Sequence, residues 1–323
     1  MLTDNLNRKI DYLRISVTDR CNLSCRYCVP SAGVAKLLPE EILSYEEILK
    51  IARIATAKGI SKIRITGGEP LIRRDLVFLI KELLRLPGVK DLGLTTNGVL
   101  LKKFALSLAQ AGLRRVNVSQ DSLLPDRYRW ITGKDYYRRV QEGLLEAERV
   151  GLSPIKLNVV ALQGFNDDEV LRFALLTKTK GYQVRFIEYM PFGDGYEPQF
   201  SSFSLDDALR KISRYEKLYP VQGDGVAEIY RFEDGRGEIG FISPISRCFC
   251  PSCRRIRLTA DGKLRNCLFS DEEIDLKCAL REGGSDAEIE QLLFKSVRKK
   301  PPGHMLQDRS IRNYHRRMSL IGG

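Results

Sequence analysis

The chain has 323 residues, 43% of them hydrophobic, which is enough for one large domain or for a large and a small one. Residues Met1–Arg20 lack a signal-peptide core, and no uncharged apolar run approaches the length of a membrane span, so we expect a cytoplasmic protein with no membrane contact. The formal charge of +12 indicates either a solvated basic surface or an anionic partner, and composition does not distinguish the two.

From residue 13 to about 190, short β-rich runs alternate with stretches of helical period. The clearest helix is predicted from Ser44 to Lys58, where Ser44 and Glu47 make a capping box and Gly59 follows. Six β–α units in series predict an α/β fold, a partial (β/α)6 barrel of the TIM type, because a full eight-unit barrel needs more chain. The predicted strands are Leu13–Val17, Lys62–Thr66, Leu92–Thr96, Arg115–Ser119, Ile155–Leu162 and Gln183–Met190.

Three cysteines, Cys21, Cys25 and Cys28, directly follow the first predicted strand. In a cytosolic chain, clustered cysteines are more often metal ligands than disulfides. A purely electron-transferring [4Fe–4S] cluster takes four thiolates, so three in a tight loop leave one iron open to another ligand. The alternative is a zinc knuckle, but structural zinc prefers four ligands, and the two histidines, His304 and His315, are distant in sequence.

The second predicted strand ends in Thr66-Gly67-Gly68-Glu69-Pro70. Glycines there allow the backbone to approach a ligand closely, at the strand ends where parallel α/β folds bind ligands.

After about residue 200 the pattern changes to short strands of antiparallel type. We expect two domains, residues 1–225 and 226–323, with the second, of α+β type, closing the open side of the barrel. Asp261-Gly262 predicts a hairpin turn. Two short helices and a basic tail, Val297–Met318, follow. The predicted strands are Ala227–Phe232, Glu238–Ser243, Arg255–Leu258 and Leu264–Leu268.

A second group of cysteines lies around this hairpin. Its members are Cys248, Cys250, Cys253 and Cys267, with Cys278 just beyond. One interpretation is a structural zinc ribbon with Cys248 or Cys278 as the fourth ligand. The cations of Cys253-Arg254-Arg255-Ile256-Arg257 instead favour a metal site that meets an anionic ligand, because arginine donates bidentately to phosphate or to a purine edge.

Four cations, Arg14, Arg64, Lys156 and Arg185, fall inside predicted strands. An unpaired buried charge is strongly destabilising, so we expect all four to point at one anion inside the barrel. The alternative is that they lie at frayed strand ends in solvent.

Together these motifs resemble a known family. Cys21–Cys28 resembles the C-x3-C-x-aromatic-C signature of the radical S-adenosylmethionine (SAM) superfamily, and Thr66–Pro70 resembles its second hallmark. The whole chain is similar to the GTP 3′,8-cyclase (MoaA) family of molybdenum-cofactor biosynthesis. The matching segments are Leu13–Pro30, Arg64–Leu71, Thr95–Gly98, Arg115–Asp121, Lys156–Val159, Arg185–Pro191, Phe249–Phe269 and Gly322-Gly323.

The resemblance implies two [4Fe–4S] clusters and SAM as cofactors. It implies that Cys21, Cys25 and Cys28 hold the SAM-cleaving cluster, and that Cys250, Cys253 and Cys267 hold a second cluster whose open iron meets the guanine. The residues implied to lie along SAM are Tyr27, Gly68, Ser119 and Met190. Those implied to contact GTP are Arg14, Arg64, Thr95, Lys156, Arg255, Ile256 and Arg257. No catalytic side chain is assigned, because the radical comes from SAM.

The implied reaction starts with a 5′-deoxyadenosyl radical that removes hydrogen from ribose C3′. The new carbon radical attacks guanine C8, and reduction gives 3′,8-cyclo-7,8-dihydro-GTP, the first intermediate of the molybdopterin pathway. The family pattern implies an electron-donor protein, a downstream cyclic pyranopterin monophosphate synthase and a possible homodimer. It also implies that the Gly-Gly tail enters the active site, although a frayed end is the commoner fate of a terminus.

Two other interpretations stay open. One is a peptide-modifying radical SAM enzyme with auxiliary clusters, which usually carries more C-terminal cysteines. The other is a zinc-stabilised RNA-binding protein, which needs aromatic platforms among its basic residues. Apart from Tyr314, no organised aromatic set is present in the basic tail, so we expect no nucleic acid partner.

Overall fold

The computed structural model describes residues 1–28, 35–190, 200–223, 225–304, 316 and 318–322. Its strands form one sheet in the order β12-β11-β10-β1-β2-β3-β4-β5-β6-β9-β8-β7. The strands are β1 (Tyr12–Ser16), β2 (Lys62–Thr66), β3 (Asp91–Thr96), β4 (Val116–Ser119), β5 (Ile155–Ala161), β6 (Gln183–Glu188), β7 (Leu218–Val221), β8 (Glu228–Phe232), β9 (Glu238–Ile242), β10 (Arg255–Leu258), β11 (Lys263–Arg265) and β12 (Glu273–Asp275).

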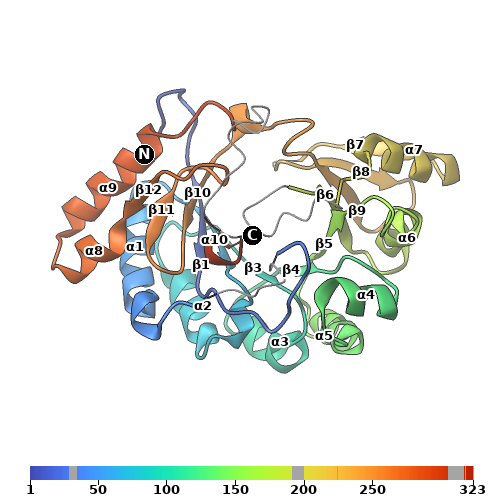
Figure 1. The fold of residues 1–323 in the computed structure, drawn as a ribbon, viewed down its shortest axis with the longest axis horizontal. Helices are drawn as coiled ribbons and strands as arrows, with labels where there is room; N and C mark the ends of the chain where they lie inside the picture. The colour runs from blue at the N-terminus through green and yellow to red at the C-terminus, as the bar shows by residue number, and fades with distance from the viewer. Residues whose placement is uncertain (29–34, 191–199, 224, 305–315, 317, 323) are drawn as a thin grey trace.

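The sheet is parallel at its centre and antiparallel at both edges. Strands β1 to β6 run parallel in sequence order, and β10 and β9 extend this set by pairing parallel with β1 and β6. The outer strands β11, β12, β8 and β7 are added antiparallel. The sheet curves into an open barrel with helices on its outer side (Figure 1). The expected partial barrel is therefore confirmed.

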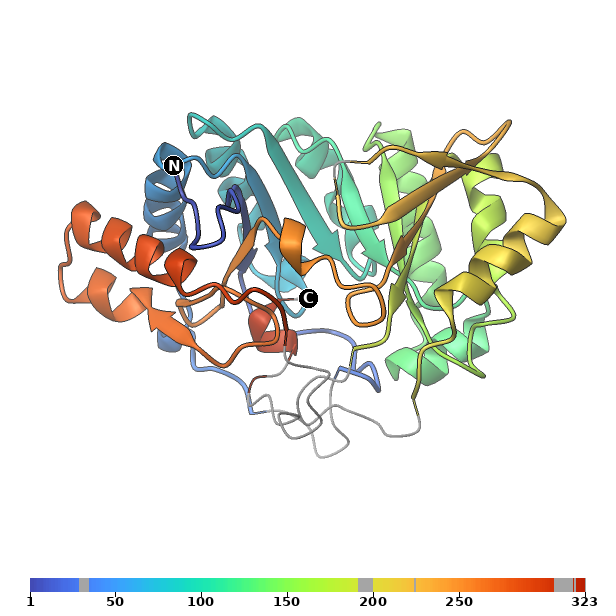
Figure 2. The ribbon, with the colours of Figure 1, turned by 90° about the horizontal axis from the view of Figure 1, so that it is seen from above.

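The crossover helices cover the convex face, whereas α10 lies on the concave side, near the middle of the molecule in both views (Figures 1 and 2). The helices are α1 (Tyr45–Ala57), α2 (Leu76–Arg85), α3 (Leu101–Gln110), α4 (Pro125–Thr132), α5 (Tyr137–Arg149), α6 (Val170–Thr179), α7 (Leu205–Tyr215), α8 (Leu276–Arg281), α9 (Asp286–Arg298) and α10 (Met318–Ile321). Among the described residues, no helix has the length and apolar character needed to cross a membrane.

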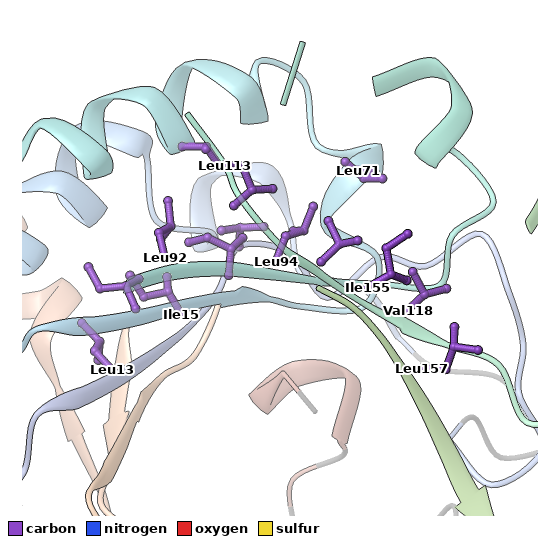
Figure 3. Packing of buried hydrophobic residues seen from close by; sticks show 14 of the residues in the cluster. Leu13, Ile15, Leu71, Leu92, Leu94, Leu113, Val118, Ile155 and Leu157 are labelled. Atoms are coloured by element: carbon purple, nitrogen blue, oxygen red, sulfur yellow. The ribbon is translucent and has the colours of Figure 1, made fainter. Parts of the chain in front are cut away.

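The main core fills the space between the sheet and the outer helices. Leu13, Ile15, Leu94 and Leu157 project from the three parallel strands β1, β3 and β5 into this layer (Figure 3) and are fully buried. Because side chains alternate along a strand, the residues between them face the inside of the barrel. The apolar residues therefore face the outer helices, and the side chains at the alternate positions face the concave side.

The predicted helix from Ser44 begins and ends close to the expected positions. Ser44 Oγ accepts a hydrogen bond from Glu47 N, and the Glu47 carboxylate accepts one from Ser44 N, which is the predicted capping box. Gly59 follows with a φ of +103°, in the left-handed region. The Asp261-Gly262 turn is also confirmed, between β10 and β11.

The six barrel strands are confirmed, with ends that differ from the predictions by two residues at most. The antiparallel pairs in the second half are confirmed as well. The sequence did not predict that β9 and β10 also pair parallel with barrel strands, because the pattern of one strand carries no information about its partner. The short strands β7 and β12 were missed.

Candidate active site

The concave face of the sheet encloses a cavity of about 1120 Å³. Side chains from the strands β1 to β6, β9 and β10 line it, together with the segments around Cys250 and His304. The cavity therefore lies where the inward-facing positions of the barrel converge.

Cations from different strands meet in this cavity because of the strand register. Arg14 on β1 pairs with Arg64 on β2 and with Arg257 on β10, so three guanidinium groups lie side by side on one face. Lys156 and Arg185, from β5 and β6, line the same cavity. The expectation that these cations converge is confirmed, and the alternative of frayed, solvated strand ends is wrong.

The crowding of like charges shifts the pKa values of the cations. Burial, reinforced by Arg185, Arg115 and Arg64, lowers the pKa of Lys156 to about 7. Burial and the neighbouring arginines lower the pKa values of Arg14 and Arg185 to about 10 each. The charged forms of these side chains are therefore less stable than in water, and a bound anion would stabilise them.

Tyr12 lies among these cations and was not predicted as a site residue. Its hydroxyl accepts a hydrogen bond from Arg64 Nε at 3.1 Å, and Lys62 and Arg255 lie over its ring. Burial opposes ionisation, but Arg64, Arg14 and Arg255 outweigh it and lower the pKa of Tyr12 to about 6. The signal in the sequence was available, since Tyr12 stands two residues before Arg14 and so shares its face of β1.

The Tyr12→Phe variant tests this anionic role. A depressed folded-state pKa contributes stability that is present at high pH and is lost as the pH falls through about 6. We therefore expect the free energy of unfolding of the parent, minus that of Tyr12→Phe, to grow as the pH rises from 6. Denaturant unfolding at several pH values measures this difference. Tyr45→Phe is the matched control, because Tyr45 also lies under an arginine but has its pKa raised to about 12; a pH-independent difference for Tyr12→Phe would contradict the assignment.

Cysteines of the second group open into the same cavity. Cys250, Cys253 and Cys267 line it, and Arg255 and Arg257 lie between the second and third of them in sequence. Burial raises the pKa of Cys253, but Lys300 and Arg255 outweigh it, so the pKa of this thiol is lowered overall. Cys278 lies on α8, is exposed, hydrogen-bonds to Glu282 and does not line the cavity.

Cysteines of the first group lie in the loop that follows β1. Burial, followed by the charge of Cys21, raises the pKa of Cys28 to about 11, and burial with Cys28, Asp121 and Cys21 raises that of Cys25 well above its usual value. Three half-buried thiols whose pKa values are all raised fit a cationic metal centre, because metal coordination stabilises the thiolate form.

Glu69 connects this loop to the end of β3. The carboxylate is fully buried and accepts hydrogen bonds from Leu71 N, Thr96 Oγ1 and Asn97 N at 3.0, 2.7 and 2.6 Å. Burial nevertheless raises its pKa to about 7. The Asn97 side chain in turn donates to Cys21 Sγ at 3.7 Å. Glu69 therefore positions the loop that carries the first cysteines.

The glycines before Glu69 pack closely against the loop that carries the first cysteines, and their expected approach to a ligand stays a prediction. A Cβ on Gly67 would lie 2.6 Å from Thr18 O, and a Cβ on Gly68 would overlap Arg20 O. Gly68 N also donates to Thr18 O at 2.7 Å. What these glycines approach in the structure is the backbone that leads to Cys21, so they are required for packing of the two loops.

Comparisons with known proteins agree with this architecture. The model of the radical SAM superfamily matches residues 15–177, and the model named Molybdenum Cofactor Synthesis C matches residues 182–306. Proteins named GTP 3′,8-cyclase from Thermodesulfovibrio yellowstonii and Moorella thermoacetica are 51% and 46% identical, with 100% of both chains covered in each case. The chain belongs to the GTP 3′,8-cyclase family of radical SAM enzymes.

Solved structures support the fold. Streptococcus suis SuiB bound to S-adenosylmethionine has a TM-score of 0.61 at 16% identity, covering 95% of this chain and 76% of that chain. The hydrogenase maturase HydG from Carboxydothermus hydrogenoformans has a TM-score of 0.51 at 17% identity, covering 66% and 53%. At these identities the likeness concerns the fold alone.

The other residues singled out by the family pattern occupy distinct positions. Thr95 and Met190 line the cavity. Ser119 ends β4 and does not line it, and the Tyr27 hydroxyl donates to Asp121 Oδ2 at 2.5 Å. Ile256 is fully buried in the main core, so its side chain faces away from the cavity, unlike those of its two arginine neighbours. The strand period of two accounts for this alternation.

Gly322 lies inside the site. It is buried, its carbonyl accepts a hydrogen bond from Arg257 Nη1 at 3.4 Å, and a Cβ added to it would overlap Thr66 Oγ1 and lie 3.1 Å from Ser16 Cβ. The expectation that the Gly-Gly tail enters the site is confirmed for Gly322, and Gly323 lies outside the described residues.

We expect Gly322→Ala to displace this segment and to lower turnover at least about ten-fold. The φ of Gly322 is +81°, which costs a side-chain-bearing residue roughly 1–2 kcal/mol before any clash. Gly283→Ala is the matched control, since Gly283 has a φ of +83° with nothing within 4 Å of the added Cβ. Steady-state kinetics measure the effect, and equal rates for the two variants would contradict it.

Proposed function

We propose that this chain converts GTP into 3′,8-cyclo-7,8-dihydro-GTP with SAM as co-substrate. The observation that carries the proposal is a single cavity that joins a cluster of cations to the second cysteine group, in a chain whose relatives are named GTP 3′,8-cyclases.

The charge of the cavity suits a triphosphate. Eleven lysine and arginine side chains line it, against two carboxylates, Asp91 and Glu238. Asp91 already pairs with Arg115, and Glu238 accepts a hydrogen bond from Gln183 at 2.7 Å, so neither cancels the central cations. Each charge-assisted hydrogen bond to a phosphate contributes about 1.5–3 kcal/mol. We assign this contact to Arg14, Arg64, Lys156, Arg255 and Arg257, with Thr95 and the backbone of Ile256 beside them.

We assign one iron–sulfur cluster to each of the two cysteine groups. Cys21, Cys25 and Cys28 would hold the [4Fe–4S] cluster, which, when bound, supplies the electron that cleaves SAM and so generates the radical. We place SAM beside this loop, in contact with Tyr27 of the loop and with Gly68, Ser119 and Met190. Cys250, Cys253 and Cys267 would hold a second [4Fe–4S] cluster, and three cysteines leave one position there for the guanine.

The chain's own residues bind and orient the nucleotide. The arginines of β1, β2 and β10 hold the triphosphate on the inner face of the barrel, which fixes the distance between the ribose and the cysteine loop after β1. Gly322, bonded to Arg257, covers part of the strand ends at Ser16 and Thr66. Both contacts restrict water and keep the reacting ribose in one orientation.

Further proposals concern the cellular context. We expect an electron-donor protein, transfer of the product to a cyclic pyranopterin monophosphate synthase, a possible homodimer and a cytoplasmic location. The division into residues 1–225 and 226–323 also stays a prediction.

Anaerobic turnover with GTP tests the proposal, with ATP as the control nucleotide. The expected product has the composition of GTP, because the hydrogen lost from C3′ is replaced by an electron and a proton, so chromatography must separate the two isomers. We expect one 5′-deoxyadenosine per product, with GTP and not with ATP. Cleavage of SAM with GTP returned unchanged would reject GTP as the substrate.

A further inference from the structure

Three potential metal ligands converge beside the second cysteine group. The ligand atoms of Cys248, Cys250 and His304 all lie within 4.8 Å of one another. Cys248 and Cys250 flank Phe249, whereas His304 comes from the segment after α9. The family pattern assigns a metal role to Cys250 but none to Cys248 or His304.

The three side chains form a donor set typical of a single divalent ion. Two thiolates and an imidazole are ligands that Zn²⁺ prefers, at about 2.3 Å for sulfur and 2.0–2.1 Å for nitrogen. These bond lengths place two tetrahedral sulfur ligands roughly 3.8 Å apart. A tetrahedral sulfur–nitrogen pair lies roughly 3.6 Å apart. The observed separations therefore need to close by about 1.2 Å at most, which small rotamer adjustments of the three side chains, the exposed Cys248 first among them, can supply.

The ring of His304 is held in place by its surroundings. Its Nε2 lies 2.6 Å from the carbonyl oxygen of Pro244, and its ring packs edge-on against Phe269 with centroids 5.3 Å apart. A backbone carbonyl on one ring nitrogen is the usual way in which proteins orient a metal-binding imidazole. With Nε2 bonded to this carbonyl, Nδ1 is the ring nitrogen that would bind the ion.

Charge and access also permit a cation here. The neighbouring Arg247 is neutralised by Asp206 and by Glu228, the latter at 3.0 Å. Cys248 is exposed, so an ion can enter from solvent without crossing the basic cavity. Two thiolates would balance the charge of a divalent ion, with one proton released from each thiol that binds.

We propose that Cys248, Cys250 and His304 bind one thiophilic divalent cation, Zn²⁺ fitting best, when the second cluster is absent, and that this ion competes with cluster assembly. Only the competition rests on the proposed function, because it needs Cys250 to be shared between the two metal centres. Cys250 cannot bind the ion and the cluster at the same time. The chain therefore holds either the ion, on Cys248, Cys250 and His304, or the second cluster.

A cobalt titration tests the site directly. The full chain is prepared reduced, iron-free and anaerobic, and Co²⁺ is added as a spectroscopic probe of thiolate ligation. The parent is expected to bind one equivalent at this site, in addition to any held by the first cysteine group, with thiolate-to-cobalt charge-transfer absorption. Cys248→Ser and His304→Ala are expected to bind at least ten-fold more weakly, whereas Cys278→Ser, which changes an exposed cysteine outside the cavity, binds like the parent.

Either of two results overturns the site. The first is no cobalt binding by the parent. The second is parent-like stoichiometry, affinity and spectrum in Cys248→Ser and His304→Ala, which would place the ion on Cys250, Cys253 and Cys267 or on the first cysteine group. Neither result depends on GTP turnover, so failure of the proposed function leaves this test intact.

The competition has its own readout in iron content. Reconstitution with iron and sulfide in the presence of one equivalent of Zn²⁺ is expected to leave the parent with about half of its iron, roughly four atoms per chain. Cys248→Ser should retain about twice as much. Equal iron contents in the two proteins would overturn the competition.

Discussion

We expect the Cys25→Ala variant to cleave no SAM, and the Cys267→Ala variant to cleave SAM but to form no cyclised nucleotide. Cys25 is half-buried beside Cys21 and Cys28, whose charges oppose its ionisation, so we assign the thiols of this loop to one metal centre. Cys267 follows the barrel strands in the chain, lines the cavity together with the cations, and belongs to the proposed second centre. Removal of one ligand from each centre separates radical generation from cyclisation.

The measurements are 5′-deoxyadenosine, cyclised nucleotide and iron content. Each variant should lose about half of its iron, roughly four atoms, if the chain carries two [4Fe–4S] clusters. Cys278→Ala is the control, because this exposed cysteine hydrogen-bonds to Glu282 and does not line the cavity. Loss of SAM cleavage in both variants, or in neither, would contradict the assignment of two centres with separate roles.

The second large effect is expected from Lys156→Met. Its ammonium group faces the cavity, where Arg185, Arg115 and Arg64 reinforce the effect of burial and lower its pKa to about 7. A charge-assisted hydrogen bond to phosphate is worth about 1.5–3 kcal/mol, so the variant should bind GTP roughly 10- to 150-fold more weakly. Since bound phosphate favours the charged form, GTP binding to the parent at pH 8 should take up a proton, and binding to the variant should not.

The same substitution should stabilise the free protein. The folded-state pKa of about 7 lies below the usual 10.5, so the charged lysine penalises the folded state fully below pH 7, and the penalty disappears as the pH rises toward 10.5. The variant should therefore melt at a higher temperature than the parent at pH 6 to 7, with a difference that narrows at higher pH. Calorimetry in buffers of different ionisation enthalpy measures the proton uptake. Lower stability together with unchanged affinity would contradict the account.

Much of the fold follows from the sequence because each parallel strand shows both its apolar core positions and the polar positions that alternate with them. The apolar positions Leu13 and Ile15 alternate with Tyr12 and Arg14, so the period of two separates the core face from the cavity face. The same period explains why Ile256, predicted with its neighbours as one segment, lies in the core. What the sequence could not reveal was the parallel pairing of β10 with β1, which brings Arg257 to Arg14.

The sequence predicts those parts of the candidate site that depend on residue type and spacing. It does not predict the parts that depend on which segments pack together in the fold. The cysteine spacings indicated both thiol groups. The role of Glu69 depends on Thr96 and Asn97, which reach it only through the neighbouring strand. His304 approaches Cys250 from a segment more than fifty residues away, so no local pattern predicts their proximity.

The most direct test of the central claim is anaerobic turnover, after reconstitution with iron and sulfide, of GTP that carries deuterium at C3′. The account predicts deuterium in the 5′-deoxyadenosine that is formed, since the hydrogen removed from the substrate ends in that product. Deoxyadenosine without deuterium, formed while GTP is consumed, would contradict hydrogen abstraction from C3′ and with it the orientation of GTP proposed for this cavity.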